Sequence, residues 1–191
     1  MLLAYNKTEV KELINYSLKL LNTRGFNGIN SFRAGGWMAD ERVWEAILEC
    51  GLSIESSATN ASLLDGSSWE GDNLQRYLKL LWENLELTSA PFYLQTFSGN
   101  LYEIPNNLGA IDYWNENKME KILEQVKHDR LQKENLTLVI NSHQETAFEN
   151  LDKLDNFINE LVYWFGNEEI KFTTNKELYF RQELSREKQR A

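Results

Sequence analysis

The sequence lacks the residues on which several classes of protein depend. Cys50 is the one cysteine among 191 residues, so no disulfide can form within the chain. No apolar run reaches transmembrane length, and residues 1–7 are too poor in apolar side chains to form a signal peptide. We therefore expect a cytoplasmic protein that does not bind membranes.

Basic residues are also scarce. The chain has 20 Lys and Arg residues against 29 Asp and Glu residues, which gives a formal net charge of −9. A chain with this balance has no general attraction for phosphate groups or anionic lipids. Nucleic acid is therefore not an expected partner.

Histidine is rare as well, because His128 and His143 are the two in the chain. A catalytic zinc ion needs three protein ligands, and no histidine pair or Cys/His cluster here has a suitable spacing. The phosphate-binding glycine motifs are missing, and no serine is placed beside a base. From its residues the chain thus predicts no metal site of its own. His128 lies among the charged residues of a predicted helix, where we expect it at the surface.

The composition fits one compact domain over residues 1–191, with 42% hydrophobic and 26% charged residues. Apolar spacing and capping residues predict helices that alternate with short strands, which is typical of an α/β protein. The predicted helices lie at residues 7–24, 41–50, 74–85, around 119–126, at 151–165 and from 175 onward. The predicted strands lie at 29–34, 52–56, 136–140 and 170–173, with a hairpin at 92–97 and 101–104. Residues 56–73 are predicted to form a long polar loop.

Two residues that follow predicted strands are candidates for chemistry, because parallel α/β sheets collect ligands at the carboxyl ends of their strands. Arg33 leaves a strand into a glycine turn. It is either an ion-pair partner of a loop carboxylate such as Glu55 or Asp65, or a donor to a catalytic carboxylate or an oxyanion. His143 ends a buried strand. It is either satisfied by backbone contacts or acts as a general acid or base.

Six tryptophans are many for a chain of this length. Three fall in helical patterns and fit a core, whereas Trp37, Trp69 and Trp114 fall in predicted loops. A flat ring with a polar edge can face a ligand such as a sugar, although loop aromatics also close the edge of a core.

The order of these segments resembles the second half of the polysaccharide deacetylase family, the NodB-type carbohydrate deacetylases. The resemblance spans most of the chain and rests on its short motifs together with their spacing. They are FRAGGW at residues 32–37, LSIESS at 52–57, LYEIP at 101–105, the strand that ends at His143, and IKFTT at 170–174.

This resemblance implies part of a distorted (β/α) barrel of mainly parallel strands wrapped by helices. It implies a reaction in which N- or O-acetyl groups are hydrolysed from a carbohydrate. Arg33 would orient the catalytic base and His143 would be the acid that protonates the leaving group. Trp37 and Trp69 would bind the sugar.

The full-length family uses a divalent metal, expected to be zinc, whose ligand motifs and catalytic base normally precede the helix that begins near Lys7. Those motifs are missing from this sequence, so we expect a truncated chain that binds no metal and is inactive alone. A partial barrel also predicts self-association or a partner chain that completes it. The alternative is a non-catalytic carbohydrate-binding or scaffold protein with the same fold. The family roles require Arg33 and His143 to share one sugar pocket.

Overall fold

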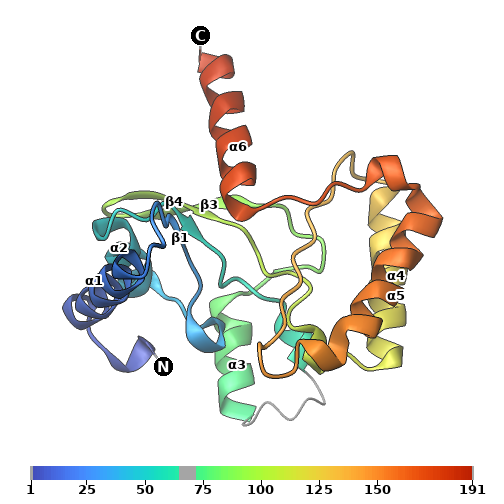
Figure 1. Ribbon diagram of the computed structural model, residues 1–191, viewed down its shortest axis with the longest axis horizontal. Helices are drawn as coiled ribbons and strands as arrows, with labels where there is room; N and C mark the ends of the chain where they lie inside the picture. The colour runs from blue at the N-terminus through green and yellow to red at the C-terminus, as the bar shows by residue number, and fades with distance from the viewer. Residues whose placement is uncertain (1, 65–71, 191) are drawn as a thin grey trace. The chain divides into compact units, whose positions relative to one another are not determined.

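The computed structural model describes residues 2–64 and 72–190, which form an α/β protein with six α-helices and one four-stranded sheet (Figure 1). The described chain divides into two compact units. Unit 1 comprises Met1–Ser57, Pro91–Ile104 and Thr173–Ala191, and unit 2 comprises Ala58–Ala90 and Pro105–Phe172. The chain passes between the units four times, so neither unit is one continuous segment. That residues 1–191 fold as a single domain stays a prediction.

Unit 1 contains the sheet, in the order β1-β2-β4-β3. Its strands are β1 (Ser31–Phe32), β2 (Ile54–Glu55), β3 (Phe92–Thr96) and β4 (Gly99–Glu103). The strand β2 is parallel to both β1 and β4, whereas β3 and β4 form the predicted antiparallel hairpin. In this register Phe32 pairs with Glu55, and Glu55 pairs with Glu103. Three strands therefore end side by side.

The helices of unit 1 are α1 (Lys7–Thr23), α2 (Glu41–Glu49) and α6 (Asn175–Arg190), and all three confirm the sequence prediction. The helix α1 starts at a capping box, in which the Asn6 side chain accepts from the Glu9 backbone and the Glu9 side chain accepts from the Asn6 backbone. Asp40 caps α2. These ends form as predicted because capping depends on residues three positions apart.

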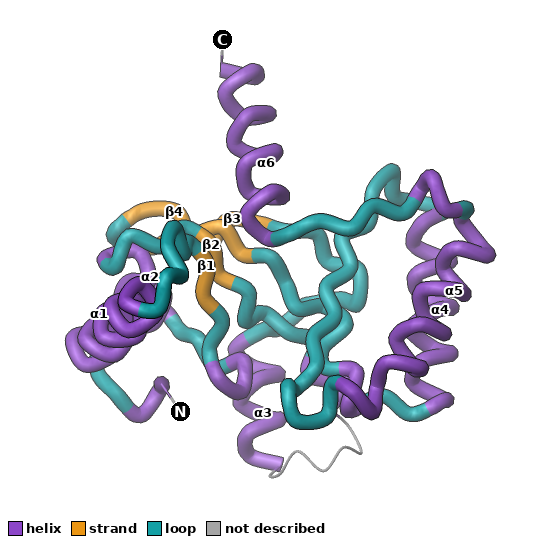
Figure 2. Tube along the Cα trace, in the orientation of Figure 1, coloured by secondary structure: helices purple, strands orange, loops and turns teal. Residues whose placement is uncertain are grey.

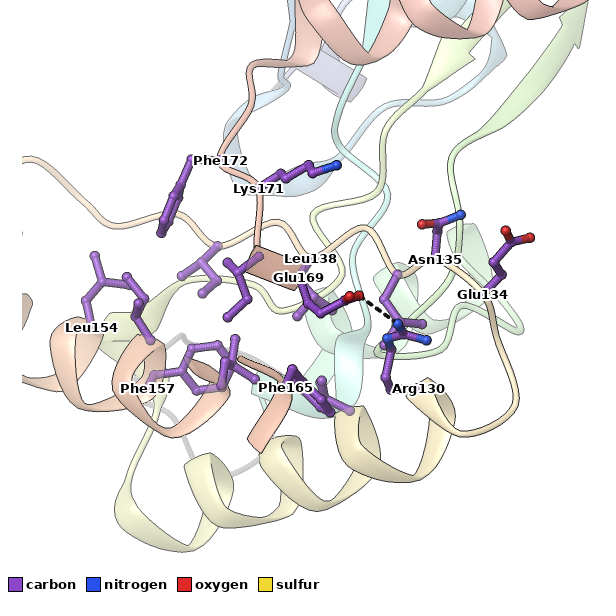
Figure 3. A pocket seen from close by; sticks show the side chains of 16 residues that line it. Arg130, Glu134, Asn135, Leu138, Leu154, Phe157, Phe165, Glu169, Lys171 and Phe172 are labelled. Carbon is purple, nitrogen blue, oxygen red and sulfur yellow. Dashed lines mark hydrogen bonds and ion pairs between the residues drawn. The ribbon is translucent and has the colours of Figure 1, made fainter. Parts of the chain in front are cut away.

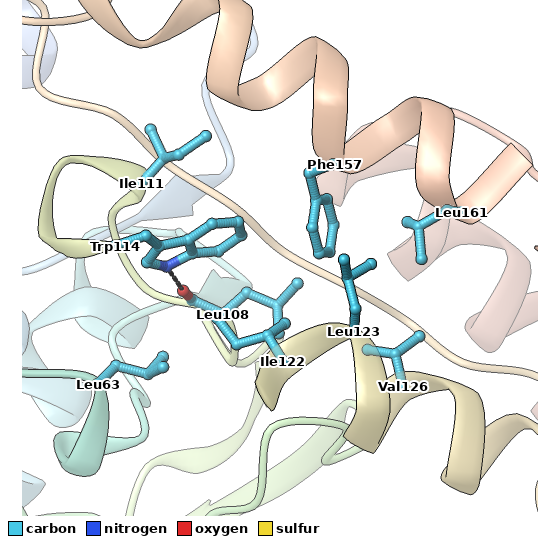
Figure 4. Packing of buried hydrophobic residues seen from close by; sticks show 9 residues of the cluster. All are labelled: Leu63, Leu108, Ile111, Trp114, Ile122, Leu123, Val126, Phe157 and Leu161. Carbon is cyan, nitrogen blue, oxygen red and sulfur yellow. Dashed lines mark hydrogen bonds between the residues drawn. The ribbon is translucent and has the colours of Figure 1, made fainter. Parts of the chain in front are cut away.

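Unit 2 contains α3 (Asp72–Leu81), α4 (Glu116–Arg130) and α5 (Leu151–Phe165), and α4 packs against α5. Its hydrophobic core lies where these two helices meet the loop that precedes α4 (Figure 4). Trp114 packs edge to face on Phe157, with ring centroids 5.0 Å apart, and its indole N–H donates to the Leu108 carbonyl oxygen at 2.9 Å. The other members of this cluster are Leu63, Ile111, Ile122, Leu123, Val126 and Leu161.

The predicted strand at residues 136–140 is a loop in the structure, so this prediction is wrong in detail (Figure 2). The segment does lie parallel to residues 108–111: the Leu108 N–H donates to Val139 O at 3.1 Å, and the Asn141 N–H donates to Gly109 O at 3.0 Å. The ladder stops there because Gly109 has a positive φ of 65° and Ile111 begins a 3-10 turn. An apolar run predicts that a segment is buried. Whether the segment forms a strand depends on the neighbouring segment with which it hydrogen-bonds.

Residues 170–173, also predicted as a strand, are a loop as well. Within residues 2–64 and 72–190 the sheet is open, with β1 and β3 at its edges, and no strand closes it into a barrel. Within the same residues, no helix is both long enough and apolar enough to span a bilayer.

Candidate functional site

Two buried carboxyl groups lie side by side in unit 1. Glu55 is the last residue of β2 and Glu103 is the last residue of β4, and the two are direct partners in the parallel register. Residues paired in this way point to the same face of a sheet. Both glutamates are completely buried. Buried carboxylates are costly unless other groups compensate them, so the surrounding donors define this site.

Arg33 supplies the positive charge of the site from the end of β1. Its Nε–H donates to the Ser56 carbonyl oxygen and a terminal N–H donates to the Ser56 hydroxyl, each at 2.8 Å. Burial lowers the pKa of the Arg33 guanidinium, while the negative charges of Glu55 and Glu103 act to raise it. The guanidinium therefore combines a hydrogen-bonding role towards Ser56 with an electrostatic role towards both carboxyl groups.

Ser57 connects the same strand ends. Its N–H donates to one oxygen of Glu55 at 2.9 Å, its hydroxyl donates to the other, and that hydroxyl accepts the Ala34 N–H at 2.8 Å. We name the group Arg33, Glu55, Ser56, Ser57 and Glu103 the strand-end cluster. Of the two carboxylates proposed for Arg33 from the sequence, Glu55 belongs to the cluster and Asp65 lies outside the described residues.

A second polar group lies in unit 2 and includes His143. The Nδ1 atom of His143 lies 3.1 Å from Oδ2 of Asp112, and the His143 backbone N–H donates to the same oxygen at 3.1 Å. The His143 side chain is 41% exposed and that of Asp112 is 10% exposed. A carboxylate on Nδ1 fixes the ring and its tautomer, which leaves Nε2 available to exchange a proton.

Asp112 is held by several donors besides His143. The Thr146 hydroxyl and the Asn150 side-chain amide both donate to Oδ1, the amide at 3.0 Å. Burial raises the pKa of Asp112, but the hydrogen bonds from Thr146 and His143 outweigh burial and lower it below its usual value. Asp112 is thus a carboxylate at neutral pH.

We expect Thr146→Val to reveal this hydrogen bond through the pH dependence of stability. The lowered pKa means that Asp112 stabilises the fold above its unfolded-state pKa of about 3.9, and that this contribution is lost as the pH falls through the lowered folded-state pKa. The variant should lose about 1 to 2 kcal/mol of unfolding free energy at neutral pH and progressively less towards about pH 3. Urea unfolding across this range measures the difference.

The exposed helix residue Thr8 provides the control, since Thr8→Val should change the unfolding free energy by less than about 0.5 kcal/mol. A deficit for Thr146→Val that does not depend on pH would contradict the assigned hydrogen bond.

The predicted sugar-binding tryptophans have different outcomes. Trp37 is buried, with 4% of its surface exposed, and it has a positive φ of 57°. Its ring therefore offers little surface to a ligand in this conformation. Trp69 lies outside the described residues. Arg33 belongs to unit 1 and His143 to unit 2. Their convergence on one pocket, and the sugar contacts, stay predictions.

Unit 2 also contains a cavity of about 380 Å³ between its helices and the segments 134–140 and 169–172 (Figure 3). Apolar side chains from α4 and α5 form its floor, among them Phe157, which also belongs to the core cluster. Four charged residues also line the cavity: Arg130, which pairs with Glu169 at 3.1 Å, and in addition Glu134 and Lys171. Two basic and two acidic groups give this lining no net charge.

The donor groups do not fit the divalent metal that the family resemblance implies. Among the described residues, no three His, Cys, Asp or Glu side chains lie close enough to hold an ion. His143, one of the two histidines in the chain, is already bound to Asp112, and the exposed His128 lies 3.1 Å from Gln132.

Comparisons with protein families, curated proteins and solved structures give no significant match to this chain. The structure thus defines the class of the protein, an α/β protein with an open, mostly parallel sheet and polar groups at its strand ends.

Proposed function

We propose that this chain is a polysaccharide deacetylase-like protein, built as part of a distorted (β/α) barrel, whose Asp112–His143 pair belongs to the machinery that hydrolyses N- or O-acetyl groups on a carbohydrate. The observation that carries the proposal is the geometry of this pair, 3.1 Å from Nδ1 to Oδ2 with a partly exposed imidazole. Together with the motif order, it supports the assignment of His143 as the acid.

In this proposal Asp112 holds the imidazole through Nδ1 and fixes the direction in which Nε2 points. Nε2 then donates a proton to the amine nitrogen or alcohol oxygen that leaves the acetyl carbon. Attack by water on the acetyl carbonyl also needs a base, and the family motif that would supply this base is missing from the sequence. We therefore expect the isolated chain to bind an acetylated carbohydrate without releasing acetate.

A test follows the two histidines by NMR while an N-acetylated chito-oligosaccharide is added to the full chain. The imidazole signals of His143 should shift saturably, whereas those of the exposed His128 on α4 serve as an internal control and should not move. The same oligosaccharide without its acetyl groups should shift His143 less, because the acetyl group is the part that lies nearest the acid. Acetate in the same samples is measured enzymatically.

Each outcome decides one part of the proposal. No shift at His143 would contradict the carbohydrate site, and equal shifts with the acetylated and deacetylated sugars would contradict the deacetylase assignment. Acetate released by the wild-type chain but not by His143→Ala would contradict the expected lack of turnover and would show that a base is present.

A second candidate, a non-catalytic carbohydrate-binding or scaffold protein, is favoured by the strand-end cluster. Arg33 donates two hydrogen bonds to Ser56, so part of its donor fork stabilises the sheet. This candidate predicts that both sugars bind equally well and that His143→Ala leaves the affinity unchanged.

A further inference from the structure

The helix α1 carries an apolar stripe that its own unit does not cover. Val10 and Ile14 are buried, and α1 packs against α2 (Figure 1). On another side of the helix Leu13 is 42% exposed, Tyr16 69% and Leu20 49%. Spacings of three and four residues place these three side chains in one line along the helix. Three exposed apolar side chains aligned on one face of a helix are typical of a surface that contacts another protein.

Charged residues flank this stripe in a definite order. Glu9 and Glu12 lie near its N-terminal end, and Lys19 and Arg24 lie near its C-terminal end. Within the described part of the chain, the side chains of Glu12, Lys19 and Arg24 form no hydrogen bond or ion pair, and all three residues are exposed.

The lysines near the start of α1 lie on a different side of the helix. Lys7 and Lys11 both pair with Glu49 of α2, each at 2.8 Å. They therefore do not neutralise the acidic end of the stripe.

We infer that α1 is the dimer contact of this protein and that it packs against α1 of a second copy in the antiparallel direction. A two-fold axis between Tyr16 and Ser17 places Leu13 of one copy against Leu20 of the other. The same axis places Glu9 at the level of Arg24 of the second copy, and it places Glu12 two residues from the level of Lys19, within reach of these long side chains. A stripe that is acidic at one end and basic at the other complements itself only when the two copies run in opposite directions. Parallel packing would place like charges together.

The partner that covers this stripe is a second copy of α1, because the charges that would complement the stripe are those of α1 itself. The apolar centre and the charges agree on one register, since Leu13 with Leu20, Glu9 with Arg24 and Glu12 with Lys19 are all related by nearly the same axis. The contact through α1 includes neither the strand-end cluster nor His143, so dimer formation is independent of the proposed carbohydrate chemistry.

Sedimentation equilibrium of the full chain over a wide concentration range tests the inference. The weight-average mass should rise from that of the 22.4 kDa chain towards twice that value. Tyr16→Glu should leave the chain monomeric at every concentration, with an unchanged circular dichroism spectrum because Tyr16 is exposed. Tyr163→Glu, at an 81% exposed helical tyrosine on α5, is the matched control and should dimerise like the wild type.

A charge reversal tests the antiparallel direction separately. Glu12→Lys and Lys19→Glu should each weaken the dimer about tenfold, because two ion pairs per dimer become repulsive, and the double variant should return to within about threefold of the wild type. A wild-type chain that stays monomeric, or a dimer that survives Tyr16→Glu, would overturn the contact. A double variant as weak as the single variants would overturn the antiparallel register.

Discussion

Arg33→Met is expected to lower the unfolding free energy by about 3 to 4 kcal/mol, one of the two largest effects that the structure predicts. Methionine has a similar length but carries neither the charge nor the donors of arginine. The variant loses both hydrogen bonds to Ser56 and leaves the buried carboxyl groups of Glu55 and Glu103 without their nearby positive charge. Urea unfolding at neutral pH measures the loss.

A second substitution separates the electrostatic part of this effect from the lost hydrogen bonds. Glu103→Gln removes one of the two negative charges, so Arg33→Met combined with Glu103→Gln should recover about 1 kcal/mol relative to Arg33→Met alone. The exposed arginine of α6, Arg181, is the control, and Arg181→Met should stay within about 0.5 kcal/mol of the wild type. If Arg33→Met behaves like this control, the strand-end cluster does not stabilise the sheet.

Phe157→Ala should have an effect of similar size in unit 2, with a loss of about 4 kcal/mol. The Phe157 side chain is completely buried and packs against the Trp114 ring. Its removal takes away apolar contacts and leaves a hole beside the existing cavity, which the surrounding helices can close only in part. Denaturant unfolding gives the size of the loss.

Phe148 offers a matched control a few residues earlier. It is 85% exposed, so Phe148→Ala should change stability by less than about 0.5 kcal/mol. Hydrogen exchange in Phe157→Ala also tests whether the chain is one domain. Because the chain crosses between the units four times, we expect both units to lose protection together. Loss of protection confined to unit 2 would contradict a single domain.

The difference between predicted and observed strands has a common cause. The hairpin of β3 and β4 forms as predicted because its partners are neighbours in sequence. The segment 136–140 depends instead on residues 108–111, where the positive φ of Gly109 interrupts the extended chain. Apolar patterning reports how well a segment can be buried, whereas a ladder needs a second segment of matching conformation.

The candidate sites divide in the same way. Position after a predicted strand singles out Arg33 and His143, although the segment before His143 is a loop in the structure. Nothing in the sequence marks Asp112 or Glu103 as their companions. Asp112 lies 31 residues before His143, and their contact exists only because the segments 110–113 and 141–143 run together. Glu103 joins Glu55 through the parallel register of β4 and β2.

The α/β class, the helices with their caps and the acidic character of the chain can all be predicted from the amino-acid sequence. Each of them depends on composition or on residues a few positions apart. The burial of Trp37, the pairing of Asp112 with His143 and the adjacency of two glutamates arise only when distant segments pack. Long-range pairing fixes which side chains meet, and no local pattern contains that information.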